Sequence, residues 1–369
     1  MRIGLVAPPW IPVPPPLYGG TESVIDNLAR GLRERGHEVV LFTVGESACP
    51  VAQRSLFPHA VEPLGQSLLE AAHVLAAYDA LRDVDVVHDH TVLGPLVAAA
   101  AGFATPPVVA TNHGTFTEVS RRVYRAVART ASVVAISHDH ARRAGDVPVA
   151  AVIHHGIDLQ RHRVGPGGDD LVFVGRMSPD KGVADAVRIA QRSGRALRIV
   201  SRMRDGDERA YFEAVVRPLL GRCHEVQELG LDERVEVVGG AAALLNPIRW
   251  PEPFGLVMPE SLAAGTPVLV RPEGAAPEIV SPGRTGWFFD DVASGVTAVG
   301  AVPLLDRRAC RHEAEARFSL ARMARDHEQL YERVLARPVV PQPRSGTVRR
   351  LPQRAVASGA TPRPTGSTP

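Results

Sequence analysis

Short apolar runs alternate with amphipathic stretches along most of the chain. Runs such as Arg2–Ala7, Val39–Phe42 and Val108–Thr111 span four to six residues, the usual length of a buried strand. Between them lie stretches with helical spacing, and in residues 24–35 apolar side chains recur every four positions. This strand–helix–strand alternation predicts an α/β protein with doubly wound parallel sheets.

The same alternation continues after residue 170. Strands are predicted at Leu171–Val174 and Leu197–Val200, with a helix between them. We also expect a helix over Tyr211–Leu220, a short strand at Val235–Val238, and a long but broken helical region over Arg307–Leu335.

The chain has 369 residues, which suits two domains and a tail. The glycine-rich segment at 165–168 is the boundary that we choose, giving an N-terminal domain at 1–165 and a C-terminal domain at 166–337. Residues 338–369 contain seven prolines, five arginines and no acid. This composition predicts a disordered tail, and its arginines would allow weak peripheral contact with an anionic membrane.

Composition and charge exclude several classes of function. The chain is 45% hydrophobic with a net charge of +2, which favours a globular core and argues against nucleic acid as the main partner. Cys49, Cys223 and Cys310 are far apart and form no CxxC pair. We therefore expect free thiols and a cytoplasmic protein, without a signal peptide, because only five uncharged residues separate Arg2 from the first proline.

Polar residues and glycines follow several predicted strands. Gly20 precedes a predicted helix, whose first N–H groups suit an anion. His113 follows the strand that ends at Thr111, and strand carboxyl ends are where doubly wound folds bind ligands. We expect His88 and His90 to point to opposite faces of the sheet, so that no more than one of them lines a cleft, and His90 is our candidate for contact with an acceptor.

A tight loop carries two cations. Residues 175–182 read GRMSPDKG, so Arg176 and Lys181 stand five positions apart. A planar guanidinium and a compact ammonium on one loop can both reach a diphosphate. Two Asp-x-Asp sequences, at 83–85 and 205–207, lie away from this loop, so we expect no metal at the site.

The stretch Asn246–Pro267 contains two carboxylates, Glu252 and Glu260, eight positions apart. A short helix is predicted there; Gly265 ends it, and Pro259 requires that it begin no earlier than about residue 257. The free N–H groups at such a helix start, together with two acids, suit a ligand that has phosphate and hydroxyl groups, such as a sugar nucleotide. The residues that lead into the helix are Phe254, Gly255, Leu256 and Val257.

These motifs together resemble the retaining glycosyltransferases of family 4, which have the GT-B fold. The resemblance rests on the E-x7-E element from Glu252 to Glu260, the loop 175–182, the GGTE sequence at 19–22 and the AAGTP exit at 263–267. It runs from Met1 to about Leu335 and is strongest to a subgroup that includes an avilamycin-type antibiotic glycosyltransferase. It implies two facing Rossmann-like domains with the active site in the crevice between them.

The resemblance also implies roles for the candidate residues. Arg176 and Lys181 would neutralise the departing diphosphate, and Glu260 would hold the ribose hydroxyls. Glu252 and His113 would hold the donor sugar, assisted by the backbone N–H groups before the helix. The implied reaction moves a hexose from a nucleoside diphosphate sugar, UDP-glucose-like, to a small-molecule, glycan or lipid acceptor, with retention and without a metal or other cofactor.

The chain departs from the family pattern at three positions. Ser201 stands where glycine is usual, His155 replaces an asparagine, and Pro259 precedes Glu260. Two other functions stay open, namely a GT-B sugar-nucleotide epimerase or hydrolase, and a non-catalytic sugar-nucleotide-binding protein. The sequence does not determine the base, the sugar, the acceptor or the oligomeric state.

Overall fold

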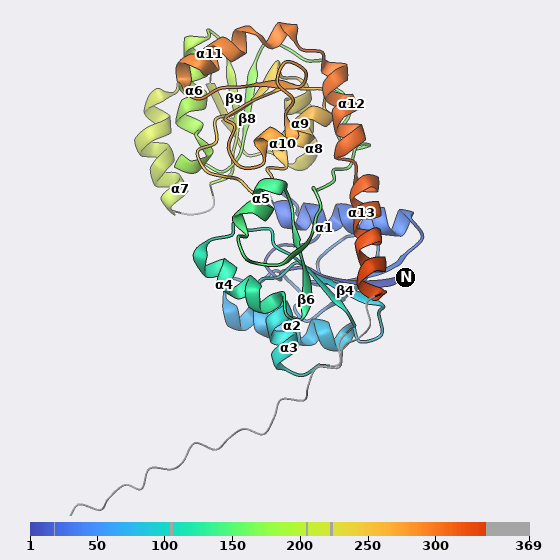
Figure 1. Cartoon of the computed structure of the whole chain (residues 1–369). Coiled ribbons are helices and arrows are strands. Elements are labelled where there is room, and N and C mark those ends of the chain that lie inside the picture. The colour runs from blue at the N-terminus through green and yellow to red at the C-terminus, as the bar shows by residue number, and fades with distance from the viewer. Residues whose placement is uncertain (18, 104–105, 204–205, 222–223, 337–369) are drawn as a thin grey trace, which may run out of the picture. The chain divides into compact units, whose positions relative to one another are not determined.

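The chain folds around two parallel sheets, each flanked by helices (Figure 1). The predicted tail, Asp205 and Cys223 lie outside the residues that the structure describes. No helix in the described part of the chain is long and apolar enough to cross a membrane. The residues described by this computed structural model are 1–17, 19–103, 106–203, 206–221 and 224–336.

The first sheet has the strand order β3-β2-β1-β4-β5-β6-β7, and all its pairs are parallel. The order changes direction between β1 and β4, which is the switch point where doubly wound folds bind ligands. The strands are β1 (Arg2–Val6), β2 (Glu38–Thr43), β3 (Ala52–Ser55), β4 (Val86–Asp89), β5 (Val108–Thr111), β6 (Ala131–Ala135) and β7 (Val149–Val152). The helices along this part of the chain are α1 (Gly20–Glu34), α2 (Ser67–Ala80), α3 (Gly94–Ala100), α4 (Glu118–Val127) and α5 (His138–Arg143).

The second sheet repeats this plan in the order β10-β9-β8-β11-β12-β13, again all parallel. Its switch point lies between β8 and β11. The strands are β8 (Leu171–Val174), β9 (Leu197–Val200), β10 (His224–Gln227), β11 (Ala243–Asn246), β12 (Val268–Val270) and β13 (Gly286–Phe288). The helices are α6 (Val183–Arg192), α7 (Gly206–Tyr211), α8 (Leu231–Gly239), α9 (Val257–Ala263), α10 (Ala276–Ile279), α11 (Val292–Gly300), α12 (Arg307–Arg317) and α13 (Leu320–Leu335).

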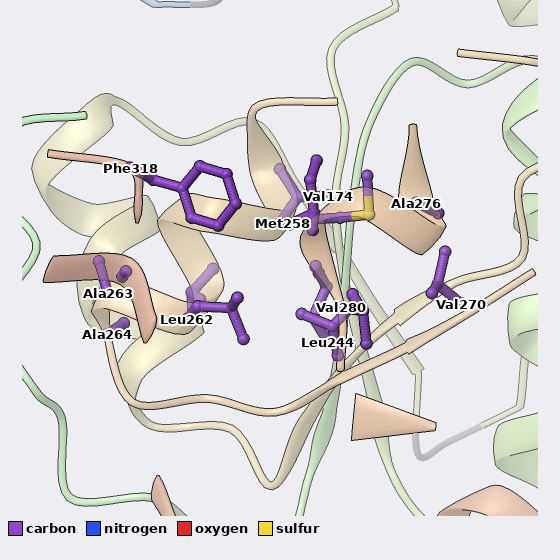
Figure 2. Packing of buried hydrophobic residues seen from close by; sticks show 14 of the residues in the cluster. Val174, Leu244, Met258, Leu262, Ala263, Ala264, Val270, Ala276, Val280 and Phe318 are labelled. Atoms are coloured by element: carbon purple, nitrogen blue, oxygen red, sulfur yellow. The ribbon is translucent and has the colours of Figure 1, made fainter. Parts of the chain in front are cut away.

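The helix α9 is held on the core of the second sheet. It begins at Val257, as Pro259 requires, and Gly265 after it has a φ of +72°, the left-handed conformation that glycine adopts most readily. Figure 2 shows its side chains Met258 and Leu262 among the residues of this core, with Phe318 beside them. The buried face therefore fixes the position of the helix start that carries the candidate residues.

The predicted long helical region is broken, as expected, into α12 and α13. The break is at Ser319, whose side chain accepts a hydrogen bond from the N–H of Arg322 at 3.3 Å and caps α13. The helix α13 then packs beside α1 (Figure 1). Its Tyr331 is fully buried in the core of the first sheet together with Leu330.

Two predicted elements are wrong. Val235–Val238 is part of the helix α8 and not a strand, because the carboxylate of Glu233 accepts from the N–H of Gly230 at 3.1 Å and starts a helix there. The predicted helix at Tyr211–Leu220 is interrupted: α7 ends at Tyr211 and gives way to a π-helical turn (Phe212–Val216) and a 3₁₀ turn (Arg217–Leu219).

We predict that Gly94→Ala will destabilise the first sheet. A Cβ at Gly94 would lie 1.9 Å from Oδ2 of Asp89, a fully buried carboxylate that also accepts from the hydroxyl of Tyr78 at 2.9 Å. The backbone must shift to avoid this clash, and we expect a loss of about 1–3 kcal/mol in the free energy of unfolding, measured with urea. Gly300→Ala is the control, because a Cβ there meets no atom within 4 Å; equal losses in the two variants would contradict the prediction.

Candidate active site

A cavity of about 190 Å³ lies where strands of both sheets end. The loops after β1, β5, β6 and β7 line it from the first sheet, and those after β8 and β11 line it from the second. This is the position where the switch points predict a ligand. The lining residues are Gly19, Gly20, Thr21, Ser23, His113, Ile136, His155, Val174, Gly175, Lys181, Arg234, Trp250, Glu252, Pro253, Phe254, Gly255, Leu256, Val257 and Glu260.

Lys181 is a buried cation in the cavity wall. Its residue is only 8% exposed, its Nζ donates to Oε1 of Glu252, and the same Nζ lies 5.5 Å from the ring centroid of Trp250. The next residue, Gly182, has a φ of +74°, and a Cβ there would lie 2.0 Å from the carbonyl oxygen of Pro247. The loop therefore needs glycine at this position to bring Lys181 against Glu252.

The second carboxylate faces two basic side chains. Oε1 of Glu260 lies 3.7 Å from Nη2 of Arg234 and 4.0 Å from Nε2 of His162. The side chains of Glu260 and Arg234 are 15% and 11% exposed. At these distances the contacts are electrostatic and leave both carboxylate oxygens able to accept hydrogen bonds from a ligand.

Backbone N–H groups reach the cavity from both sheets. Gly20 begins α1, and its N-cap residue Gly19 provides no side-chain cap. Opposite, Gly255 has a φ of +84°, and no carbonyl of the described residues accepts from the N–H of Gly255 or Leu256. Donors of this kind beside a cation suit an anionic ligand.

His113 provides a neutral imidazole at the same cavity. Burial, with a smaller contribution from the neighbouring His140, lowers the pKa of His113 to about 3. Its Nε2 lies 2.9 Å from Nδ1 of His90, and its ring stacks at 5.3 Å on that of His155. The contacts with His90 and His155 therefore fix the orientation of the His113 ring, and the ring is uncharged at neutral pH.

Two family models match the chain in succession. Residues 18–161 match the model described as Glycosyltransferase Family 4, and residues 158–299 match the model described as Glycosyl transferases group 1. The chain is a glycosyltransferase with the GT-B fold. The fold predicted from the sequence is therefore confirmed.

Curated relatives and solved structures agree with this assignment. The glycosyltransferase is 28% identical to a glycogen synthase of Mycobacterium tuberculosis (strain ATCC 25618 / H37Rv), over 96% of this chain and all of the relative. The structure of AviGT4, a glycosyltransferase involved in avilamycin A biosynthesis, superposes with a TM-score of 0.70 at 24% identity, covering 91% of this chain and 98% of that one. The sucrose-phosphate synthase from Thermosynechococcus elongatus gives a TM-score of 0.77 at 20% identity, covering 91% and 99%.

A complex with ligands is also similar in fold. The structure of Anabaena Alr3699/HepE with UDP and glucose has a TM-score of 0.72 at 18% identity, covering 90% of this chain and 99% of that one.

The structure brings most of the predicted site residues of the glycosyltransferase together. Arg176 and His90 are the exceptions. The side chain of Arg176 is 47% exposed and donates to Asp180 at 3.0 Å, outside the cavity lining. His90 is buried behind His113, and its ring lies 4.1 Å from that of His88. The expectation that these two histidines point to opposite faces is wrong, because residues two apart on a strand share a face. The predicted residues that line the cavity are Gly20, His113, Lys181, Glu252, Phe254, Gly255, Leu256, Val257 and Glu260.

The sequence analysis did not predict the cation Arg234 or a second, smaller cavity beside it. Arg234 lies on α8, directly before the residues where we predicted a strand, so its place beside Glu260 was not expected. It also lines a smaller cavity of about 20 Å³ that shares Val174 and Gly175 with the first. Ser201 lines this second cavity, and its Oγ is buried without a hydrogen-bond partner among the described residues.

Within the described residues, no group of three or more His, Cys, Asp or Glu side chains is arranged to hold a metal ion. Asp83 and Asp85 both contact Arg2, and Asp205 lies outside the described residues. Metal independence itself stays a prediction.

We predict that Glu278 makes the glycosyltransferase sensitive to acid. Burial alone would raise the pKa of this carboxyl, but hydrogen bonds from His154 and from the N–H groups of His138 and Asp139 outweigh it and lower the pKa to about 2. A carboxyl with a lowered pKa stabilises the fold above its unfolded value near 4.5, and this contribution is lost as the pH falls towards 2.

Glu278→Gln should therefore lower the free energy of unfolding by about 1.5–3 kcal/mol at pH 7. The difference from the wild type should shrink as the pH falls from 5 to 2.5 in urea titrations. Glu315→Gln is the control, because this carboxylate is half exposed and, in the described part of the chain, pairs only with Arg311 on its own helix. A difference that is constant with pH would show that the charge of Glu278 is not the cause.

Proposed function

We propose that the glycosyltransferase moves a hexose from a nucleoside diphosphate sugar, UDP-glucose being the first donor to test, to an acceptor with retention of anomeric configuration and without a divalent metal. The observation that carries the proposal is the cavity that is lined by Lys181 in contact with Glu252, by Glu260, and by backbone N–H groups of Gly255 and Leu256 that no carbonyl of the described residues accepts from. The resemblance to the avilamycin-type subgroup makes small molecules the first class of acceptor to screen.

In this proposal Lys181 breaks its ion pair with Glu252 and pairs instead with the donor diphosphate. The ammonium is already buried and oriented, so little reorganisation is needed when the leaving group gains charge. Arg176 would turn from Asp180 to the same diphosphate, which its exposed side chain permits. Glu252, once released, would accept from hydroxyls of the donor sugar, and Glu260 would accept from the ribose.

The first experiment is a thermal-shift screen of nucleoside diphosphates and their sugars. A ligand at a hundred times its dissociation constant adds about 2.7 kcal/mol to the stability of the folded state. We expect UDP or UDP-glucose to give the largest shift, because Alr3699/HepE has been seen with UDP and glucose. A larger shift with another nucleotide would correct the base, and Ser201 and Arg202 in the second cavity are then the residues to vary.

Turnover separates the proposal from its alternatives. Sugar-nucleotide consumption that depends on an acceptor supports transfer, whereas consumption without an acceptor supports an epimerase or hydrolase. Tight binding without turnover over a broad acceptor panel supports a non-catalytic protein. Product anomers identified by NMR test retention, and activity that is lost with EDTA and restored by Mg²⁺ or Mn²⁺ would refute metal independence.

A further inference from the structure

A row of buried imidazoles leads from the cavity into the first sheet. His155 and His113 line the cavity, whereas His88 in β4 and His90 directly after β4 lie behind them. The ring centroids of His113 and His90 are 5.2 Å apart, and those of His90 and His88 are 4.1 Å apart. His88 is fixed in turn, because its two nitrogens lie 2.7 Å from the hydroxyls of Tyr331 and Thr111. The row therefore connects the cavity to α13.

The contact between His90 and His113 is a hydrogen bond between two neutral rings. Nδ1 of His90 lies 2.9 Å from Nε2 of His113, and burial lowers the pKa of both imidazoles far below neutrality. A neutral imidazole carries one proton, so one ring must donate and the other accept. Which ring donates decides what His113 can offer to a ligand.

The second ring nitrogen of His90, Nε2, distinguishes the case in which His90 donates from the case in which His113 donates. Nε2 of His90 is buried and has no hydrogen-bond partner among the described residues. If His113 donated, His90 would carry its proton on this nitrogen as an orphaned buried N–H. If His90 donates, the same nitrogen is a bare acceptor, and buried orphaned N–H groups are the rarer of the two. Nδ1 of His113 is not among the buried atoms that lack a partner and can meet solvent or ligand in either arrangement.

We propose that His90 is a positioning residue that donates from Nδ1 to His113 and so holds His113 in the tautomer with its proton on Nδ1. His113 then presents an N–H donor to the cavity. A ligand oxygen on that side accepts this hydrogen bond; that the oxygen belongs to a donor sugar rests on the proposed function. The tautomer itself does not depend on the proposed function.

The direct test is ¹⁵N–¹H correlation NMR on the full chain labelled with ¹⁵N-histidine, which distinguishes protonated from bare ring nitrogens. Signals of His113 and His90 are assigned from the spectra of His113→Asn and His90→Asn. We expect His113 to carry its proton on Nδ1 at pH 7. A proton on Nε2 of His113, with Nδ1 bare, would overturn the proposal whatever the enzyme transfers.

Variants of His90 test whether its hydrogen bond to His113 affects the rate of turnover. An asparagine amide can take the place of Nδ1, whereas a glutamine amide takes that of Nε2, so His90→Asn should keep the hydrogen bond and His90→Gln and His90→Leu should lose it. With UDP-glucose as donor, we expect kcat to be about three- to tenfold lower in His90→Gln and His90→Leu and close to wild type in His90→Asn. The proton on Nδ1 of His113 should be lost in His90→Gln and His90→Leu and kept in His90→Asn.

The control is His327→Leu. This buried ring lies 5.1 Å from that of His88, and among the described residues it is hydrogen-bonded only to the carbonyl of Met323. It therefore belongs to the same cluster without a hydrogen bond to His113. If kcat falls as much in His327→Leu or in His90→Asn as in His90→Leu, the imidazoles act only by packing. If UDP-glucose is not turned over at all, the proposed donor fails while the NMR result still decides the tautomer.

Discussion

Replacing Lys181 with alanine is expected to lower turnover by about 100- to 1,000-fold, the usual cost of removing one preorganised group that stabilises charge in the transition state. UDP should also bind more weakly, because its diphosphate would meet Glu252 without the intervening ammonium. Steady-state kinetics and UDP titration calorimetry measure the two effects. Arg192→Ala is the matched control, since it removes one exposed positive charge from the helix that follows.

Arginine at position 181 is not expected to restore the activity that Lys181 supports. The ammonium occupies a buried position between Glu252 and the ring of Trp250, and a larger planar guanidinium cannot take that position without displacing one of them. Lys181 is the single lysine in a chain with 42 lysines and arginines together. Lys181→Arg is therefore expected to lose nearly as much activity as Lys181→Ala, and wild-type activity in this variant would contradict the argument from shape.

The single lysine also permits a chemical test on the wild-type protein. An amine-reactive reagent can modify only Lys181 and the N-terminal amine, so mass spectrometry identifies the site directly. We expect UDP to protect Lys181 and leave labelling of the N-terminus unchanged. Labelling of Lys181 at the same rate with and without UDP, at a UDP concentration that raises the melting temperature, would show that the diphosphate does not contact it.

The two carboxylates should respond differently to substitution. Glu252→Gln is expected to lower turnover by about ten- to a hundredfold, the cost of a hydrogen bond to a charged group, while UDP binds at least as tightly as in the wild type. The physical reason is that Glu252 competes with the diphosphate for Lys181 and also repels it. Glu260→Ala should act mainly on the Michaelis constant for the donor, because its carboxylate is expected to hold the ribose.

Kinetics at saturating acceptor, with calorimetry of UDP binding, decide between these roles. Glu273→Gln is the control, since Glu273 is an exposed acid after β12, outside the cavity lining. Weaker UDP binding in Glu252→Gln with unchanged turnover, together with slower turnover alone in Glu260→Ala, would reverse the assignment. No effect in either variant would mean that the pair is structural.

Elements defined by local spacing were predictable. The proline at 259 limited where α9 can begin, and the helix does begin at Val257. Such features depend on backbone sterics within a few residues. The wrong prediction at Val235–Val238 is also local, because an alternating V-E-V-V run fits a strand and a helix alike, and the capping interaction between Gly230 and Glu233 decides for the helix.

The pairing of side chains was decided only by the tertiary structure. The sequence indicated that Lys181, Glu252 and Glu260 belong to one site, but not that Lys181 pairs with Glu252 while Arg234 faces Glu260. His90 was predicted to reach a ligand and instead lies behind His113. Partners such as Lys181 and Glu252 are 71 positions apart, and the packing of α9 and the loops after β8 and β11 brings them together. Local sequence determines which elements form, whereas contacts at this separation depend on how those elements pack.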